Sequence, residues 1–452
     1  MRIALLVNEF PAASETFVLD HVCALIERGH RVDVFPERPY APPAVIHPEL
    51  AAYACLDRSH FPPPMPSARV ARALAGARLV FSSGAVHAAS MFRSVNPLAY
   101  GRQGPSLALL FRQVPFHGSE PYDVVHCHHG PVGVVGANLL RLGVLRGRLV
   151  VTFHGFDANV VPRIGGADVY TRLFRKADLI TVNSEFLRGR LRALGAPEDR
   201  LARLPMGVDP AAFAPASTLR AADPGRSTGD EIRLLSVARL VEEKGIAFAL
   251  RAVARLAPRF PGLRYQVIGE GPLRGSLERL ARQLGISDRV VWLGALPRDR
   301  VRAYYADAHL FALPGVRARN GAEESQGLAL IEAQASGLAV VASDVGGIPE
   351  SLRNGRTGFL VPERDVEALA ERIAALIRRP GLRAAMGRAG RAFARRHFDR
   401  NVLVDRLVSL YEEVVGRPPA APPRVSRRRQ PVAWKPPVGR LPSGSDATGK
   451  LR

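Results

Sequence analysis

Two glutamates with seven residues between them form the densest cluster of candidate functional groups in the chain. Glu324 follows an apolar run at residues 310–313 and a polar loop, at the mouth of a predicted helix that runs from Ser325 to Ser336. Glu332 lies about two helical turns further on, so it points to the same general side. Its carboxylate can accept hydrogen bonds from vicinal hydroxyl groups, as acidic residues in dinucleotide-binding folds do with ribose.

The start of the same helix is a candidate anion site. The first N–H groups of a helix have no partner within it, so they can hold an anion such as phosphate. Here these N–H groups belong to Ser325, Gln326, Gly327 and Leu328. A structural alternative stays open, because two glutamates at this spacing often arise by chance. In that alternative Glu324 takes the place of an N-cap residue and Glu332 lies on a solvated face.

A basic pair follows the first apolar run in the second half of the chain. Arg239 and Lys244 come just after a predicted strand at residues 233–237, where an open α/β sheet would place a bound phosphate. Arg239 offers a planar fork and Lys244 a compact charge. Lysine is scarce in this chain, since only Lys176 and Lys244 precede the tail. We therefore favour phosphate binding over a pair that merely balances the adjacent glutamates.

Turns and a histidine follow other predicted strands. Gly271 lies in a Gly-Glu-Gly-Pro turn after residues 265–268, and such a turn admits close approach to the backbone. A Gly-Gly loop at residues 345–350 either offers a second such approach or caps the next helix. His154 ends another strand, which would place its ring at the cleft. The alternative is a structural histidine that is hydrogen-bonded to Asp157.

A run of three histidines and one cysteine suggests a metal site: His126, Cys127, His128 and His129. Alternate residues of a strand point to opposite faces, so a strand here would split the four side chains between two faces. We therefore favour core packing over a zinc site.

These candidates stand at the ends of short apolar runs that alternate with helix-length amphipathic segments. This alternation is typical of parallel α/β domains, which bind ligands at the carboxyl ends of their strands. We predict two Rossmann-like domains that face each other across a cleft. Residues 36–120 are less regular, apart from a helix-like stretch at 67–91. The predicted parts are a first domain at 1–213, a linker at 214–230, a second domain at 231–400, a C-terminal helix at 401–415 that returns to the first domain, and a disordered basic, Pro-rich tail at 416–452.

The composition agrees with a soluble enzyme. The chain has 452 residues, 47% of them apolar and 23% charged, which is too long for one core and excludes disorder of the whole chain. Three cysteines without a CxxC pair exclude a disulfide scaffold and indicate a reducing compartment. No uncharged apolar stretch of about 20 residues occurs, so we predict a cytoplasmic protein. The net charge is +22, and we favour a solvated tail over one that attracts anionic partners.

In this order the motifs resemble those of the family 4 glycosyltransferases, which have the two-domain GT-B fold. The resemblance covers residues 1–415. It rests on Arg239 with Lys244-Gly245, Gly269-Glu270-Gly271-Pro272, the pair Glu324 and Glu332, residues 333–337, and Asp344-Val345-Gly346-Gly347-Ile348-Pro349-Glu350. Residues 10–17 and His154-Gly155-Phe156-Asp157 are similar to a subgroup in bacterial exopolysaccharide synthesis, which includes colanic-acid-type enzymes.

The resemblance implies retaining transfer of a hexose-type sugar from a nucleotide-diphosphate sugar to a glycan or lipid-linked acceptor, without a metal or other cofactor. It implies that Arg239 and Lys244 bind the diphosphate of the donor and that Glu332 binds its ribose. Glu324 would contact the hydroxyl groups of the donor sugar, and His154 would lie near the transferred sugar. The sequence departs from the family at residues 14–16, where Ser-Glu-Thr replaces the common Gly-Gly loop.

Other functions remain open at this point. A nucleotide-sugar epimerase or a glycan phosphorylase could share the fold, although a phosphorylase needs a lysine for pyridoxal phosphate and lysine is scarce. A non-catalytic membrane or nucleic-acid adaptor would suit the charge, but no RNA-binding aromatic motif occurs, so we expect no nucleic-acid partner. Peripheral contact with an anionic membrane at its inner face is a further expectation. It rests on the basic residues Arg69, Arg72, Arg78, Arg424, Arg427, Arg428 and Arg429, of which the first three lie among the apolar residues Val70, Leu74, Leu79, Val80 and Phe81.

Overall fold

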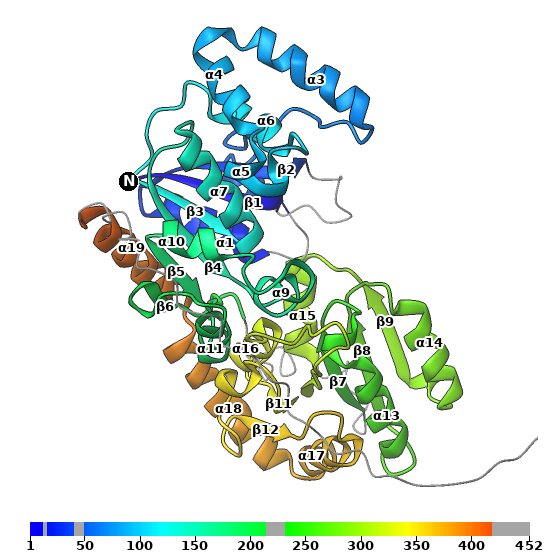
Figure 1. Ribbon diagram of the computed structural model, residues 1–452. Helices are drawn as coiled ribbons and strands as arrows, with labels where there is room; N and C mark the ends of the chain where they lie inside the picture. The colour runs from blue at the N-terminus through cyan, green and yellow to red at the C-terminus, as the bar shows by residue number, and fades with distance from the viewer. Residues whose placement is uncertain (12–15, 40–48, 214–230, 418–452) are drawn as a thin grey trace, which may run out of the picture. The chain divides into compact units, whose positions relative to one another are not determined.

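The structure, a computed structural model, describes residues 1–11, 16–39, 49–213 and 231–417 (Figure 1). Its strands form two six-stranded sheets, with the orders β2-β1-β3-β4-β5-β6 and β12-β11-β10-β7-β8-β9. All pairings within both sheets are parallel. The predicted linker, the residues Ser14 and Glu15, and the tail beyond Arg417 lie outside the described residues.

The first sheet forms from apolar runs that are buried on both faces. In β3 and β5 every residue is buried, as expected for parallel strands covered by helices on each side. The shortest strand, β6, was not predicted, because three residues give no readable pattern. The strands are β1 (Arg2–Phe10), β2 (Arg31–Pro39), β3 (Val124–His128), β4 (Arg148–Phe153), β5 (Leu179–Val182) and β6 (Leu201–Arg203).

Helices cover this sheet and extend beyond its edge. The predicted helix-like stretch at 67–91 is two helices, because Gly84 takes a positive φ of +72° between them. The helices of the first domain are α1 (Thr16–Glu27), α2 (Glu49–Ala52), α3 (Arg69–Ser82), α4 (Gly84–Ser94), α5 (Pro97–Tyr100), α6 (Ala108–Arg112), α7 (Gly130–Leu142), α8 (Phe156–Asn159), α9 (Val161–Gly165), α10 (Thr171–Lys176) and α11 (Glu185–Ala193).

The second sheet is built in the same way, with its core between β-strands and amphipathic helices. Its strands are β7 (Ile232–Val237), β8 (Leu263–Ile268), β9 (Val290–Gly294), β10 (Leu310–Leu313), β11 (Ala339–Ser343) and β12 (Gly358–Val361). Its helices are α13 (Ile246–Leu256), α14 (Arg274–Gln283), α15 (Arg298–Asp307), α16 (Leu328–Ala335), α17 (Val366–Arg378) and α18 (Pro380–His397).

Helix α16 starts later than we predicted. It begins at Leu328 rather than at Ser325, and Gly327 precedes it with a φ of +81°. The backbone N–H groups of Gln326 and Gly327 donate to the carboxylate of Glu324. The prediction of free N–H groups at these two positions was therefore wrong, because Glu324 folds back onto the turn.

The last helix, α19 (Arg400–Gly416), packs on the first domain. Leu407, Tyr411 and Val414 are buried in the same hydrophobic cluster as residues of β1 and α1. The guanidinium of Arg28, the residue after α1, donates to the Asp405 carboxylate at 2.7 Å. One side of the first sheet is thus completed by residues from the far end of the described chain.

Candidate active site

A cleft of about 530 Å³ lies at the carboxyl ends of strands from both sheets. The first domain contributes residues that follow β1, β3 and β4 or lie in β1 and β2, and the second contributes residues that follow β7 and β10. The lining comprises Asn8, Phe17, Glu37, His129, Pro131, Val132, His154, Phe156, Asp157, Val161, Arg239, Glu243, Lys244, Ala322, Glu323, Glu324 and Ser325. The four residues that we predicted to be catalytic, Glu324, His154, Arg239 and Lys244, are all among them.

Lys244 and Glu324 form an ion pair at this cleft. Lys244 ends a short 3-10 turn, and the next residue, Gly245, has a φ of +66°. A Cβ at Gly245 would lie 1.7 Å from the carbonyl oxygen of Pro314, so only glycine lets this turn sit against the end of β10. The close approach brings the Lys244 ammonium into contact with the Glu324 carboxylate.

The Glu324 side chain is only 12% exposed. Burial alone would raise the pKa of its carboxyl group. The Lys244 ammonium and the N–H groups of Gly327 and Gln326 outweigh that effect and hold the pKa below its ordinary value. Glu324 is therefore a carboxylate that accepts hydrogen bonds, and not a proton donor, near neutral pH.

Arg239 is the more open member of the basic pair. Its side chain is 58% exposed, and its guanidinium lies 3.6 Å from the carboxylate of Glu243. The alternative in which the pair only balances adjacent glutamates therefore holds in part for Arg239. It does not describe Lys244, whose partner Glu324 lies 80 residues further along the chain.

His154 reaches the cleft from the end of β4. Its Nε2 lies 3.0 Å from Nδ1 of His128. The Asp157 carboxylate instead accepts from the backbone N–H groups of His154, Gly155 and Gly130. Burial is the main cause that lowers the pKa of His154 well below 6.5, so the ring is neutral. These hydrogen bonds of Asp157 thus fix the backbone of this loop rather than the imidazole of His154.

Ser325 and Gln326 connect the two domains. The Ser325 hydroxyl donates to the carbonyl oxygen of His154 at 2.6 Å and accepts from the Asn183 amide at 2.9 Å. The Gln326 amide bonds both the N–H and the carbonyl of Met206, each at 2.8 Å. We predicted donor binding through the backbone N–H groups of this turn. Its Ser325 and Gln326 side chains are engaged with the first domain, and donor binding by its backbone stays a prediction.

Five of the predicted donor-binding residues lie outside the lining of this cleft: Gly271, Gln326, Gly327, Leu328 and Glu332. The Glu332 carboxylate accepts from the Tyr305 hydroxyl at 2.9 Å, and burial raises its pKa. A Cβ at Gly271 would lie 2.6 Å from the carbonyl oxygen of Leu240, so this glycine is required for packing between two loops. Leu328 begins α16 and does not line the cleft either. Their roles in donor binding stay predictions.

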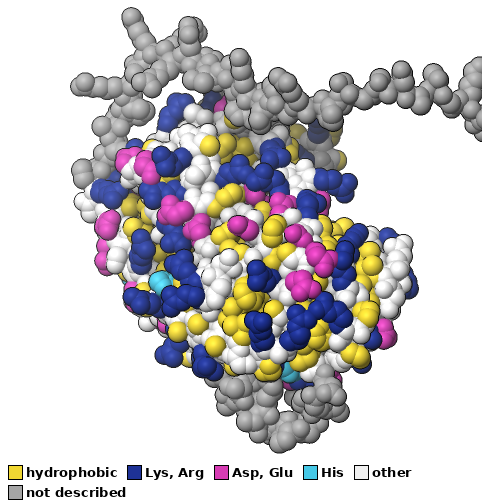
Figure 2. All heavy atoms as spheres, turned by 90° about the horizontal axis from the view of Figure 1, so that it is seen from below, with side chains coloured by type: hydrophobic (Ala, Val, Ile, Leu, Met, Phe, Trp, Pro, Cys, Tyr) yellow, Lys and Arg dark blue, Asp and Glu magenta, His cyan; other side chains and the backbone are white. Residues whose placement is uncertain are grey.

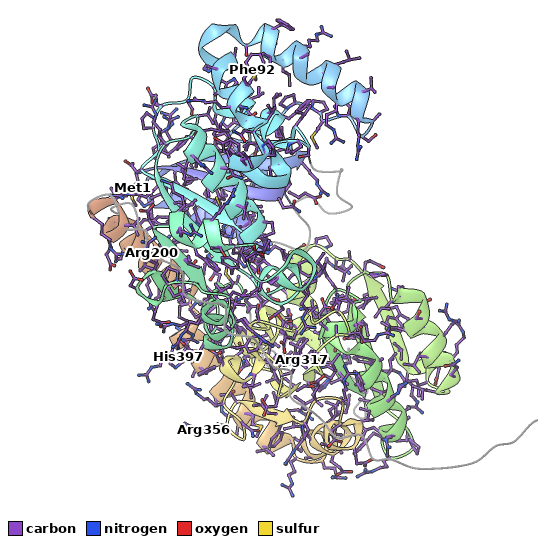
Figure 3. The ribbon with its side chains drawn as sticks, in the orientation of Figure 1. Met1, Phe92, Arg200, Arg317, Arg356 and His397 are labelled. Carbon is purple, nitrogen blue, oxygen red and sulfur yellow. The ribbon has the colours of Figure 1, made fainter. Side chains whose placement is uncertain are left out.

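Sequence reasoning missed several residues of the cleft, and Glu323 is the clearest case. Its side chain is fully buried between two guanidinium groups, with Arg190 of α11 at 2.8 Å and Arg317 at 3.2 Å. Arg317 is labelled in Figure 3. Nothing local marks Glu323, because Arg190 stands 133 residues earlier. Glu37 was missed because residues 36–120 gave no regular pattern.

Three residues of the histidine run, His126, Cys127 and His128, are part of the core, whereas His129 lines the cleft. In β3, His126 and His128 are fully buried on one face, and Nε2 of His126 lies 2.7 Å from the Thr152 hydroxyl. Within the described ranges, no group of three or more histidine, cysteine, aspartate or glutamate residues could hold a metal ion.

Comparison with known proteins gives the same assignment for both halves. A model described as Glycosyltransferase Family 4 matches residues 14–212, and one described as Glycosyl transferases group 1 matches residues 221–393. A Salmonella typhimurium protein assigned as the colanic acid biosynthesis glycosyltransferase WcaL is 33% identical over 379 residues, which cover 83% of this chain and 90% of the relative. The amylovoran biosynthesis glycosyltransferase AmsK of Erwinia amylovora is 29% identical over 92% of this chain and 100% of its own length.

Among solved structures, Anabaena HepE in complex with UDP-glucose superimposes with a TM-score of 0.65 and 18% identity, over 91% of this chain and 99% of the other. Two parallel sheets with a cleft at their carboxyl ends, together with this superposition, define the GT-B fold, which confirms the predicted fold class. The chain belongs to the family 4 glycosyltransferases.

Proposed function

We propose that this glycosyltransferase takes its sugar from a nucleotide-diphosphate donor. The observation that carries the proposal is a single cleft lined by Arg239, Lys244 and Glu324 from one domain and by His154 from the other. When the donor is cleaved, negative charge develops on the departing diphosphate. Two cations at the same cleft stabilise that charge in the transition state.

The acceptor in this proposal is a glycan or a lipid-linked saccharide, and the product is a cell-surface polysaccharide. The relatives support this, since they are named for the biosynthesis of colanic acid and of amylovoran. The structural neighbour from Anabaena was solved with UDP-glucose, which supports a nucleotide sugar as donor. An epimerase, a phosphorylase and a non-catalytic adaptor gain no support from these relatives.

We propose that transfer retains the configuration of the donor sugar and proceeds on its front face. A covalent route would need a free carboxylate beside the reacting carbon. On the first-domain side of the cleft, Glu37 accepts from Arg112 at 2.7 Å. Asp157 accepts from four backbone N–H groups. Both carboxylates are engaged, so neither suits the role of nucleophile.

The decisive experiment is to incubate the full chain with a panel of nucleotide sugars and to measure the release of nucleoside diphosphate. Release from one or a few donors, increased by an extract that contains lipid-linked saccharides, is the expected result. No release from any donor would contradict the proposal. Once a product is obtained, the anomeric coupling of the new linkage tests retention.

We also propose that α3 contacts an anionic membrane, which would present a lipid-linked acceptor. No helix in the described part of the chain is long and apolar enough to cross a bilayer. Val70, Leu74 and Phe81 on α3 are 74%, 69% and 88% exposed. Their spacing places them on one side of the helix, with the exposed side chains of Arg69 and Arg78 near them.

The predicted membrane pattern needs one correction. Leu79 and Val80, which we had grouped with the exposed residues, pack inward against a small hydrophobic cluster. Arg72 also turns inward, and its guanidinium donates to the carbonyl oxygens of Pro66 and Ser67 at 2.8 Å. The surface proposed for lipid contact is therefore narrower than the sequence suggested. Figure 1 shows α3 and α4 at the edge of the first domain, farther from its sheet than α7.

A further inference from the structure

A series of neighbouring imidazole rings extends from the cleft into the first domain. The ring of His154 lies 5.2 Å from that of His128, and the ring of His128 lies 4.5 Å from that of His126 and 5.3 Å from that of His21. Burial is the main cause that lowers the pKa of each ring. A neutral imidazole has one N–H donor and one acceptor nitrogen, so its hydrogen bonds decide its tautomer.

The tautomer of His126 follows from its partners. The buried hydroxyl of Tyr411, on α19, lies 2.5 Å from Nδ1 of His126. We take the hydroxyl as the donor, because it has no other partner among the described residues and its proton would otherwise be buried without a hydrogen bond. The proton of His126 is therefore on Nε2, which donates to the Thr152 hydroxyl at 2.7 Å. Neither nitrogen of His126 bonds to His128, so the tautomers of the two rings are determined independently.

The tautomer of His128 follows from the nitrogen that has no partner. Its Nδ1 faces Nε2 of His154 at 3.0 Å, and its Nε2 is buried with no hydrogen-bond partner among the described residues. Among backbone groups, a buried N–H without a partner is rarer than a buried acceptor without one, and we apply the same rule to the imidazole. The proton of His128 is therefore on Nδ1 and is donated to His154.

We infer that His128 is a positioning residue that holds His154 as the Nδ1–H tautomer. Because Nε2 of His154 accepts from His128, the proton of the cleft-lining ring is on its other nitrogen. His154 then offers an N–H donor rather than an acceptor to an oxygen atom in the cleft. The inference rests on the proposed function in one respect only, which is that this oxygen belongs to the transferred sugar.

The tautomer can be read directly by NMR of the full chain with ¹⁵N-labelled histidine, because the two imidazole nitrogens differ in shift and in proton coupling. The signals of His154 are assigned by their loss in His154→Gln. The expected result is a proton on Nδ1 of His154. A proton on Nε2 of His154 would overturn the inference, and this measurement needs neither a donor nor a folded variant of His128.

Three variants test whether His128 sets this state. In His128→Asn the side-chain amide can replace the Nδ1–H donor, so His154 keeps its tautomer. In His128→Leu the donor is lost, and His154 becomes a mixture of tautomers. His126→Leu is the matched control, because it removes an equally buried ring of the same strand that does not bond His154. If His126→Leu and His128→Leu change the His154 signals alike, the effect is only structural and the inference fails.

The same variants are then assayed for nucleoside diphosphate release. We expect His128→Leu to lower kcat about tenfold, as for the loss of one hydrogen bond in the transition state, with a much smaller change in KM. His128→Asn should recover most of that loss. An equal kcat for the parent and His128→Leu would overturn the inference. Failure of every variant and of the parent to cleave any donor would instead count against the proposed function, while the tautomer result would stand.

Discussion

Lys244 lies between two anionic groups, the Glu324 carboxylate that it contacts and the diphosphate that we propose it binds. A buried carboxylate beside an ammonium orients that ammonium through their ion pair. In this chain the ion pair also joins the turn after β7 to the loop after β10, so the two halves of the second-domain site are set together. The role proposed for Lys244 is thus to bind the diphosphate and, through its ion pair with Glu324, to hold the two loops of the site in position.

The first prediction concerns the basic pair. Arg239→Ala and Lys244→Ala should each lower nucleotide-sugar turnover at least tenfold, because a charge-assisted hydrogen bond is worth roughly 1.5–3 kcal/mol. Arg319→Ala is the control, since that side chain is 93% exposed and does not line the cleft. Release of nucleoside diphosphate measures all three. Parental turnover in both cleft variants would refute the assignment of this pair.

The second prediction separates the two glutamates. Glu332→Gln should weaken nucleoside diphosphate binding, because it alters a group that we propose bonds the ribose. Glu324→Gln should abolish transfer but preserve diphosphate binding, since Glu324 is expected to contact the hydroxyl groups of the donor sugar, and the nucleoside diphosphate lacks that sugar. Titration calorimetry with the nucleoside diphosphate distinguishes the two. An equal loss of affinity would argue against separate roles.

At the scale of elements, the sequence predicts most of the strands but few of the contacts between them. The apolar runs locate the ends of β4, β7 and β10, and parallel topology brings those ends together, so His154, Arg239 and Glu324 could be predicted. The roles of Ser325 and Gln326 could not, because their partners are the backbone of His154 and Met206, more than a hundred residues away. Local sequence patterns do not indicate such contacts between distant residues.

Helix α3 carries the third prediction, which is binding to anionic vesicles. Each basic residue near the surface contributes about 1 kcal/mol, and high salt should reverse the binding. Serine at Val70, Leu74 and Phe81 together should weaken co-sedimentation, because the exposed apolar stripe is lost. Val402→Ser is the control, since Val402 is a similarly exposed apolar residue on α19.

A chain that ends at Gly416 separates the contribution of α3 from that of the tail. If α3 carries the contact, the shortened chain should still bind at low salt and lose binding when α3 is substituted. No co-sedimentation of the full chain with anionic vesicles at low salt would refute the membrane proposal. Binding that persists at high salt would indicate insertion of α3 rather than electrostatic attachment.

At the scale of the whole molecule, charge is widely distributed. The net charge is +22, and Figure 2 shows Lys and Arg side chains spread over the described part of one face, with acidic side chains among them. Such a distribution favours general attraction to anionic surfaces rather than one defined patch. The apolar residues of α3 therefore matter for the proposal, because they would give the attraction an orientation.

The fourth prediction is metal independence. Saturating EDTA should leave transfer intact, because Arg239 and Lys244 are proposed to supply the positive charge that a divalent cation provides in other transferases. Turnover is compared with and without EDTA at one donor concentration. Loss of activity that manganese or magnesium restores would overturn this part of the mechanism.

The return of α19 to the first domain has a consequence for synthesis of the protein. Tyr411 and its neighbours fill one side of a core that includes β1, so β1 can complete its packing only after a helix from the far end of the described chain has been made. Domains otherwise tend to fold in the order in which they are made. Here the second domain can fold before the first is complete. Until translation has passed residue 414, the first sheet exposes an apolar face, to which a chaperone could bind.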